Sequence, residues 1–274
     1  MSSGNIKIET IFWDNYSIIE NMKNTVHWED VINRLRNLRV FANEQKLSPV
    51  LQSKCLLKIA EIRANYGGIG NKREAVHTSR IALELLSQNL EPELKYNILK
   101  AQGVALHVLG ANLVAKAIFE EALDIIHTYK LPRKREFDIR REIAQCLYTF
   151  GYPKLAKKEL IYLLQESLDK SFNRDILLNC LRLTEACIFS DEPKNVEYNL
   201  QQFEKLMTEA QSSISQSELN RIKVIASRIK SHYLIRYEDK YTTYSILQEA
   251  LQSARIYGYA FQESKLLKLI SLVN

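Results

Sequence analysis

Apolar positions recur at helical spacing along most of the chain, and residues 96–130 show the pattern most clearly. Leu99, Gly103 and Leu106 follow one another at intervals of four and three, which places them on one face of a helix. Gly110 then supplies the permissive backbone that a short turn between two helices needs.

The second half of this stretch repeats the same intervals. Ala115, Phe119 and Ala122 are again spaced by four and three residues. The small residues, together with Gly103, would let two antiparallel helices approach closely, while Phe119 fills the space between them. The pattern therefore predicts a helical hairpin.

The hairpin recurs with a period of about 40 residues. The gaps are 40 and 41 residues for the turn glycines and for the alanines that open second helices, and 40 residues for two proline pairs. These markers are Gly70, Gly110 and Gly151; Ala75, Ala115 and Ala156; Pro92 with Pro132; and Pro153 with Pro193. Such a repeat predicts a solenoid, in which each unit packs on its neighbours.

The succession of large, small and aromatic positions around a glycine turn resembles the tetratricopeptide repeat (TPR). The matching positions are Leu99, Gly103, Leu106, Gly110, Ala115, Phe119 and Ala122. His127 stands where the family has its closing proline, and the period exceeds the family's roughly 34 residues. The resemblance implies an all-α, right-handed α-solenoid. Its long repeats are similar to the helical-repeat domains of bacterial regulators and peptide sensors.

We therefore expect one TPR-like domain over residues 1–274, with about six antiparallel helix pairs and a C-terminal helix. The expected pairs span roughly 5–46, 50–88, 93–129, 134–168, 174–210 and 216–257, and the terminal helix spans 259–273. The GGIG run at 67–70 is interpreted as a helix-breaking turn before a helix that starts at residue 72. It is not interpreted as a phosphate loop, because no strand precedes it.

Composition adds little to this picture. The net charge of +6 is modest for 274 residues and is weak evidence for nucleic-acid binding. The sequence has neither an apolar run of membrane-spanning length nor a signal-peptide pattern, so we expect a cytoplasmic protein without a membrane segment. The four cysteines form no CxxC pair, and we interpret them as buried apolar residues in a reducing compartment.

No recognised catalytic pattern occurs. The five histidines are scattered, and neither an HExxH nor a G-x-S-x-G nor a Walker P-loop sequence is present. We therefore expect a protein that is not an enzyme, with no catalytic residues, no metal and no cofactor.

A solenoid offers instead a concave surface formed by the first helix of each pair. The TPR resemblance implies that polar side chains there hold an extended peptide by its backbone or its terminal carboxylate. The groove candidates are Asn97, Lys100 and His107 on one first helix, and Arg141, Gln145 and Tyr148 on the next. The alternative for these six residues is simple solvation.

Two other surfaces are candidates for contacts. Arg133, Lys134 and Arg135 form a basic corner that could meet an anionic partner, although acidic residues interleave with it. The terminal helix is unusually apolar for the end of a solenoid. Its residues Leu266, Leu267, Ile270 and Val273 could pack inward, dock against a second copy in a homodimer, or continue the stacking in a partner.

The leading hypothesis is a non-enzymatic scaffold or regulatory adaptor that binds a protein or peptide in its groove. A narrower version is an intracellular sensor of a short signalling peptide that controls a transcription regulator. A nucleic-acid-binding repeat protein is less favoured, because no residue recurs as a base-reading code. The remaining alternative is a segment of a larger helical assembly.

Overall fold

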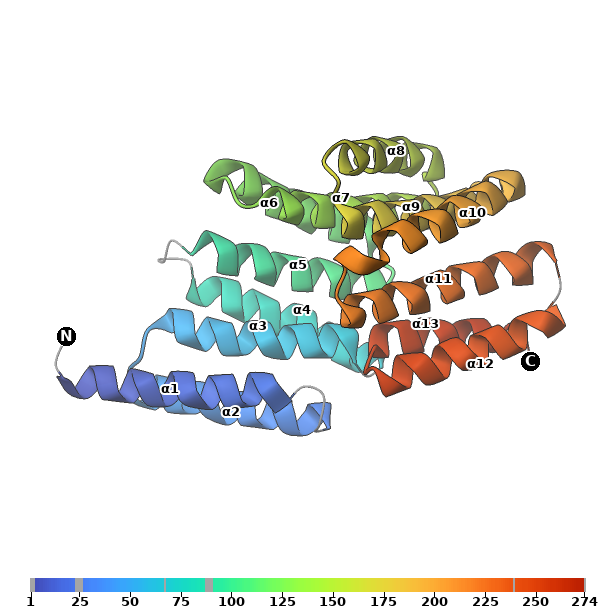
Figure 1. Ribbon diagram of the computed structural model, residues 1–274. Coiled ribbons are helices and arrows are strands. Elements are labelled where there is room, and N and C mark those ends of the chain that lie inside the picture. Colours follow the sequence, from blue (N-terminus) through green and yellow to red (C-terminus); the bar gives the residue numbers. More distant parts are fainter. Residues whose placement is uncertain (1–2, 23–26, 67, 87–90, 239, 274) are drawn as a thin grey trace. The chain divides into compact units, whose positions relative to one another are not determined.

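The computed structural model describes residues 3–22, 27–66, 68–86, 91–238 and 240–273, and within these ranges it contains helices and turns but no strand (Figure 1). The order matches the predicted hairpins, and the predicted bounds that fall on described residues lie within three residues of a helix end; the predicted end at residue 88 lies outside the described residues. The helices are α1 (Ser3–Asn21), α2 (Trp28–Glu44), α3 (Pro49–Asn65), α4 (Ile69–Leu85), α5 (Pro92–Val108), α6 (Asn112–Tyr129), α7 (Arg133–Phe150), α8 (Pro153–Asp169), α9 (Asn173–Phe189), α10 (Pro193–Ala210), α11 (Gln216–Tyr237), α12 (Lys240–Ile256) and α13 (Ala260–Ile270), with a short 3₁₀ helix, η2, at Gln211–Ser213.

Many of these helices end in the same way, with one residue in the left-handed region of backbone space. The next residue then donates its N–H to a carbonyl five positions back, as Ala111 does to Leu106 over 3.0 Å and Tyr152 does to Leu147 over 2.8 Å. Glycine fills the left-handed position at Gly110, Gly151 and Gly258, whereas Lys46, Lys130, Ser171 and Asp191 fill it elsewhere.

One predicted turn residue is placed differently. Gly70 lies in the first turn of α4, which begins at Ile69 rather than at residue 72. Gly68 is the residue before the helix, so the turn ends earlier than the 40-residue spacing suggests. Gly70 therefore precedes Gly110 by the repeat spacing of 40 residues, but it lies in a helix and not in a turn.

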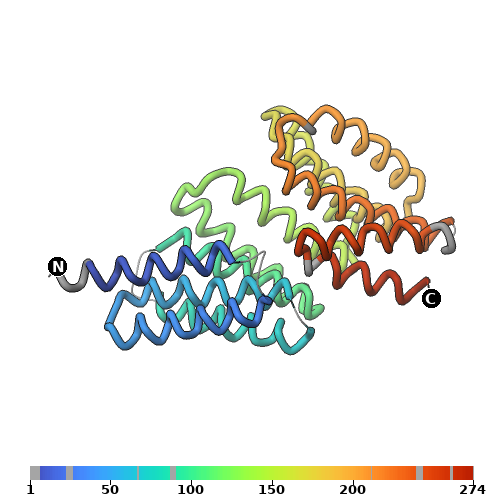
Figure 2. The backbone as a smooth tube through the Cα atoms, turned by 60° about the horizontal axis from the view of Figure 1, so that its bottom comes forward, coloured from blue at the N-terminus to red at the C-terminus, as the bar shows by residue number. Residues whose placement is uncertain are grey.

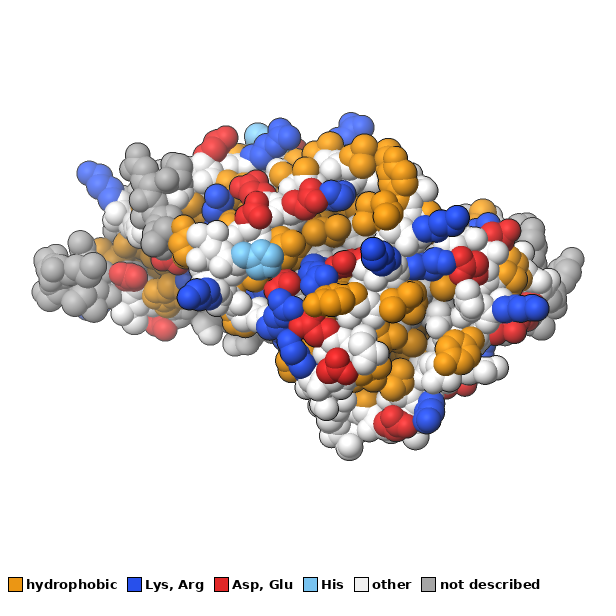
Figure 3. Space-filling view, turned by 90° about the horizontal axis from the view of Figure 1, so that it is seen from above, with side chains coloured by type: hydrophobic (Ala, Val, Ile, Leu, Met, Phe, Trp, Pro, Cys, Tyr) orange, Lys and Arg blue, Asp and Glu red, His pale blue; other side chains and the backbone are white. Residues whose placement is uncertain are grey.

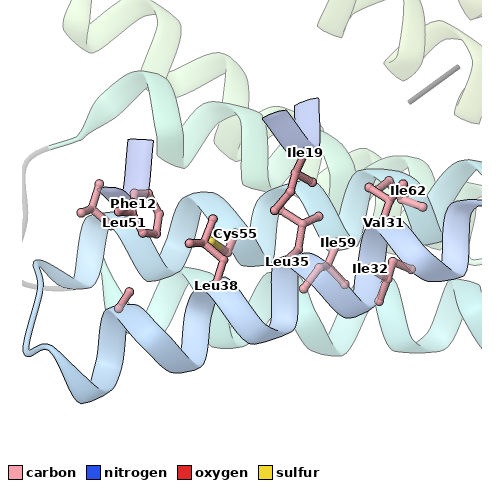
Figure 4. Close-up of a cluster of buried hydrophobic side chains, with 11 residues drawn as sticks. Phe12, Ile19, Val31, Ile32, Leu35, Leu38, Leu51, Cys55, Ile59 and Ile62 are labelled. Carbon is pink, nitrogen blue, oxygen red and sulfur yellow. The ribbon is translucent and has the colours of Figure 1, made fainter. Parts of the chain in front are cut away.

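The chain divides into two compact units, Met1–Ile139 and Arg140–Asn274, called unit 1 and unit 2 below. In unit 1 successive helices run back and forth, as the blue and cyan part of Figure 2 shows. Phe12 and Ile19 of α1 meet Leu35 of α2 and Ile59 of α3 in one buried cluster (Figure 4). Burial of such apolar side chains is the main favourable term for these pairs.

The predicted match of small and large residues occurs in unit 1. Gly103 of α5 faces the ring of Phe119 of α6, and Ala115 and Ala122 are fully buried beside it. A Cβ atom added at Gly103 would come within 2.5 Å of that ring. The close approach of α5 and α6 therefore depends on glycine at this position.

In unit 2, α9 is the most enclosed helix, and it packs on α8, α10 and α11. The terminal helix α13 packs against α11 and α12. Leu266 and Ile270, two of the four predicted docking residues, are 0% and 8% exposed in this core, where Val273 also packs. Those residues are used within the unit, so the inward-packing alternative describes them. Leu267 remains exposed.

Candidate functional site

The first helices of the pairs in unit 2 carry a connected set of polar and aromatic side chains at repeat spacing. Tyr148 on α7, Phe189 on α9 and His232 on α11 lie in series, with ring centroids 5.1 and 5.9 Å apart; the first pair is tilted and the second meets edge to face. Because the three positions are 41 and 43 residues apart, the same face of each helix contributes. This face of α7, α9, α11 and α13 is the candidate site.

Glu185 of α9 lies at its centre. Its carboxylate accepts hydrogen bonds from the Tyr148 hydroxyl at 2.6 Å and from the guanidinium groups of Arg182 and Arg228, both at 2.8 Å. Together with Glu142, Gln262 and Lys265, these residues are called the Glu185 cluster below. The Arg228 partner is 43 residues away, so the cluster joins neighbouring repeats.

The charged groups of this cluster shift the pKa values of Glu185 and Tyr148 in opposite directions. Burial alone would raise the pKa of Glu185, but Arg228 and Arg182 hold it well below the ordinary value. Burial, followed by the Glu185 charge, raises the pKa of Tyr148 well above its ordinary range. Glu185 is therefore ionised and Tyr148 is a neutral donor near pH 7.

Arg228 of α11 and Lys265 of α13 bring basic side chains to this cluster. Arg228 Nε donates to Gln262 Oε1 over 3.1 Å, whereas Arg228 Nη2 is buried without a hydrogen-bond partner. Burial and then Arg228 lower the pKa of Lys265 to about 7, against the opposing effect of Glu185. Burial also lowers the pKa of His232.

A second buried ion pair joins α7 to α9. Arg141 Nη1 donates to Asp175 Oδ1 at 2.8 Å and to Asn179 Oδ1 at 3.2 Å. Asn179 in turn donates from Nδ2 to the Ser167 hydroxyl at 2.8 Å. These contacts tie α7, α8 and α9 together, so Arg141 has a structural role.

The three groove candidates in unit 2 are thus placed in the interior. Arg141, Gln145 and Tyr148 are 4%, 2% and 1% exposed, respectively. The expectation that their side chains offer free donors in an open groove does not fit this burial, because a ligand can only reach exposed atoms. The face they lie on is nevertheless the one that holds the Glu185 cluster.

The three candidates in unit 1 all lie on α5. Lys100 Nζ lies 3.4 Å from Asp138 Oδ2, and Asn97 Oδ1 accepts a hydrogen bond from Arg135 over 3.4 Å. His107 Nδ1 is 2.7 Å from Asn112 Oδ1. They are less buried than the candidates in unit 2, and their contact with a ligand stays a prediction.

The basic corner at the start of α7 is largely compensated within the chain. Arg133 pairs with Glu136, and Arg135 pairs with Glu93 and lies 5.0 Å from the Tyr96 ring centroid. Lys134 is exposed. On the face of the molecule that Figure 3 shows, basic and acidic side chains are intermixed.

Arg182, Glu185, Arg228 and Lys265, which carry the charge of the site, were not predicted from the sequence. A signal was present, because Glu185 and Arg228 lie 43 residues apart, one repeat, on first helices. Opposite charges at the same position of adjacent repeats indicate a contact between helices. To compare these positions from the sequence alone, one must know which residues of the later, less regular repeats correspond to one another.

The described residues contain neither a candidate metal site nor a helix that could span a membrane. No group of three or more His, Cys, Asp or Glu side chains there could hold a metal ion. Among the same residues, none of the helices combines the length and the apolar character of a membrane span. All four cysteines are buried, as the sequence predicts.

Comparison with known proteins places the fold. No family model and no curated protein matches the sequence. Among solved structures, aspartyl phosphate phosphatase F from Bacillus subtilis matches with a TM-score of 0.67 at 10% identity, over 98% of this chain and 72% of that one. A Rap protein complexed with competence and sporulation factor matches with a TM-score of 0.63 at 10% identity, over 96% and 74%.

A third match concerns the repeat itself. Nearly identical TPR-like repeats of a Podosopora anserina protein described as a kinesin light chain match with a TM-score of 0.61 at 13% identity. They cover 73% of this chain and 95% of that one. These likenesses confirm the predicted all-α, TPR-like helical-repeat fold.

Proposed function

We propose, from the premise that this chain has a TPR-like helical-repeat fold, that it is a non-enzymatic regulatory scaffold that binds a protein or peptide. The binding surface is the first-helix face of unit 2. The observation that carries the proposal is the exposed ring of Phe189, which lies between the rings of Tyr148 and His232 on this face. The Glu185 cluster is largely buried, and its hydrogen bonds fix α7, α9 and α11 against one another, which orders this face.

The structural neighbours support this class of function. One of these neighbours, a Rap protein, is complexed with competence and sporulation factor. A narrower proposal follows from that neighbour, in which the chain senses a short signalling peptide and passes the signal to a regulator.

Exposed aromatic surface supports binding rather than simple solvation. Phe189 is 38% exposed between the rings of Tyr148 and His232. Aromatic side chains beside satisfied charges are common at the centres of interfaces, where they supply contact area at low entropic cost. A peptide lying across α9 would contact Phe189 directly.

The experiment is affinity selection of a library of short synthetic peptides on the purified protein, read by mass spectrometry. Phe189→Ser should lose most of the selected peptides, because it removes exposed apolar surface from the proposed site. Tyr198→Ser, which changes a 61% exposed aromatic residue on α10, is the matched control and should retain them. Equal loss in both variants, or no selected peptide at all, would contradict the proposal.

The non-enzymatic part has its own test, because one neighbour is named as an aspartyl phosphate phosphatase. The protein is mixed with receiver domains phosphorylated on aspartate, and the loss of phosphate is followed over time. We expect the rate to equal spontaneous hydrolysis. A faster, protein-dependent rate would make the chain an enzyme.

A further inference from the structure

Unit 1 carries a cleft that the proposed function does not use. It lies between α2 and α3 and has a volume of about 240 Å³. Ligand pockets usually measure about 300–1,000 Å³, so this cleft has room for one side chain rather than for a larger molecule. The lining residues are Trp28, Val31, Lys58, Glu61, Ile62, Asn65 and Tyr66.

Two aromatic rings line the cleft. Trp28 is the first residue of α2 and Tyr66 directly follows α3, and these ends meet because the two helices run in opposite directions. The two ring centroids lie 6.4 Å apart with an angle of 28° between the ring planes, and His27 stacks on Trp28 at 5.5 Å. Trp28 and Tyr66 are both partly exposed, so a ligand can reach them.

The inner part of the cleft is apolar. Val31 and Ile62 are 2% and 8% exposed, and they lie side by side at one end of the buried cluster in Figure 4. Trp28 and Tyr66 pack against the same cluster, which holds the two rings in place. The aliphatic part of a long side chain would find apolar contacts here while its polar end remains near the rim.

The rim of the cleft contributes a carboxylate. The side chain of Glu61 is 39% exposed. Lys58 Nζ lies 3.0 Å from Glu61 Oε2 and 3.3 Å from Glu20 Oε1, so two carboxylates compensate the charge of this lysine. Because a carboxylate has about four lone-pair sites, Glu61 can accept further hydrogen bonds beside the one from Lys58.

Aromatic rings beside a carboxylate favour an organic cation. The face of an aromatic ring attracts a cation, most strongly for tryptophan, and the attraction increases where water is partly excluded. A guanidinium group is planar and weakly hydrated, so it can lie on a ring and donate to a carboxylate at the same time. An ammonium group lacks the flat surface, and a neutral group lacks the charge.

We propose that the cleft of unit 1 binds the side chain of an arginine residue from a protein or peptide partner. The guanidinium group lies against Trp28 and Tyr66 and donates to Glu61. The aliphatic part of the arginine contacts Val31 and Ile62. This cleft is separate from the first-helix face of unit 2, so the inference does not depend on the proposed function.

The test follows the indole N–H signals of the two tryptophans by NMR, because Trp28 lines the cleft and Trp13 does not. The probe is the blocked peptide acetyl-Gly-Arg-Gly-amide, and the variant Trp13→Phe assigns the two signals. The matched control peptide contains citrulline, which resembles arginine in shape but is neutral. We expect the Trp28 signal to shift with a dissociation constant at least about tenfold lower for arginine than for citrulline.

Two further probes define the chemistry and its source. The peptide with lysine in place of arginine should bind more weakly, because an ammonium group cannot stack flat on a ring. Free L-arginine should bind no more tightly than the blocked peptide. Tighter binding of the free amino acid would mean a small-molecule site, and the assignment to a partner's side chain would be wrong.

A pair of variants assigns the effect to Glu61. Glu61→Gln should weaken binding of the arginine peptide by about tenfold and leave the citrulline peptide unchanged. Glu44→Gln removes an exposed carboxylate at the other end of α2 and should change neither affinity, so it controls for net charge. Circular dichroism confirms that each variant is folded, and the comparison of peptides on wild-type protein needs no variant.

Three results would overturn the inference. The first is an unchanged Trp28 signal at about 10 mM arginine peptide, a concentration that detects even millimolar affinity. The second is equal affinity for the arginine, lysine and citrulline peptides. The third is an equal effect of Glu61→Gln and Glu44→Gln. None of these results bears on peptide binding at unit 2, so the two proposals fail or stand separately.

Discussion

At the scale of single residues, Glu185 shows how a buried charge can hold repeats together. Its carboxylate is stabilised only because Tyr148, Arg182 and Arg228 donate to it from three helices. Removing one partner of such a buried network typically costs about 3–5 kcal/mol, whereas the intact network adds little net stability. Its effect is therefore mainly on the specificity of helix packing.

Lys265 makes the stability of the protein depend on pH. Burial and Arg228 lower its pKa to about 7 in the folded chain, with Arg182 acting in the same direction and Glu185 and Glu142 against it. The unfolded chain holds this proton up to about pH 10.4. Between these values the unfolded state binds more protons, so the contribution of Lys265 to stability increases as pH rises.

We therefore expect wild-type protein to gain free energy of unfolding relative to Lys265→Met as pH rises from about 7 to about 10. Urea denaturation of both proteins at several pH values measures this difference. Lys268→Met is the control on the exposed side of α13. A similar trend in the control would indicate a general effect of net charge rather than of burial.

At the scale of helices, the α5–α6 hairpin depends on one contact between a small and a large residue. Gly103→Ala would place a Cβ atom 2.5 Å from Phe119 Cε1, so the ring or the helix must shift. We expect a loss of about 1–3 kcal/mol of stability, although alanine is the better helix former by up to about 1 kcal/mol. Chemical denaturation measures the net change.

The control for this prediction is Gly70→Ala. Gly70 is also helical, and an added Cβ atom there meets nothing within 4 Å. This variant should be neutral or more stable. Combining Gly103→Ala with Phe119→Leu should recover part of the loss, and complete additivity of the two changes would contradict the proposed contact.

The residues that adopt left-handed geometry at helix ends are only partly predictable from the local sequence. Gly110 and Gly151 mark turns because glycine adopts left-handed backbone geometry without strain. Lys46, Lys130 and Asp191 adopt the same geometry at φ of 51°, 52° and 60° without any sequence signal. There the capping hydrogen bond and the packing of the hairpin compensate for the strain.

At the scale of the whole molecule, stability in a repeat fold is the sum of contacts between neighbours. In unit 2, α9 has 13 buried residues among 17, packs on α8, α10 and α11, and is also hydrogen-bonded to α7. The terminal helix α13 has 11 residues and packs on α11 and α12. Local opening should therefore be easiest at α13 and hardest at α9.

Hydrogen exchange with mass spectrometry tests this order. Peptides from α13 should exchange well before those from α9 under native conditions. Equal exchange of α9 and α13 would mean that unit 2 opens as one cooperative unit.

Much of the fold was predictable, because it follows from periodicity. Spacings of three and four define the helices, and the interval of about 40 residues between Ala75, Ala115 and Ala156 defines the hairpins. The match of Gly103 with Phe119 was also predictable, since small and large residues alternate within one hairpin. The single-domain description of 1–274 remains a prediction beside the two compact units.

The site was harder to predict. Arg141 and Tyr148 were predicted to face an open groove, whereas both are buried and bonded to Asp175 and Glu185 of the next repeat. Sequence spacing gives the face of a helix, but not which long side chains bury their charges against a neighbour. That outcome depends on distances between helices.

The sequence by itself determined the helices, their hairpin order and the TPR-like fold, because each follows from local spacing and residue size. Only the tertiary structure decided that Leu266 and Ile270 pack into their own unit and that Arg182, Arg228 and Lys265 meet around Glu185. The physical reason is that burial and pKa depend on three-dimensional proximity. Residues 43 positions apart acquire that proximity only when repeats stack.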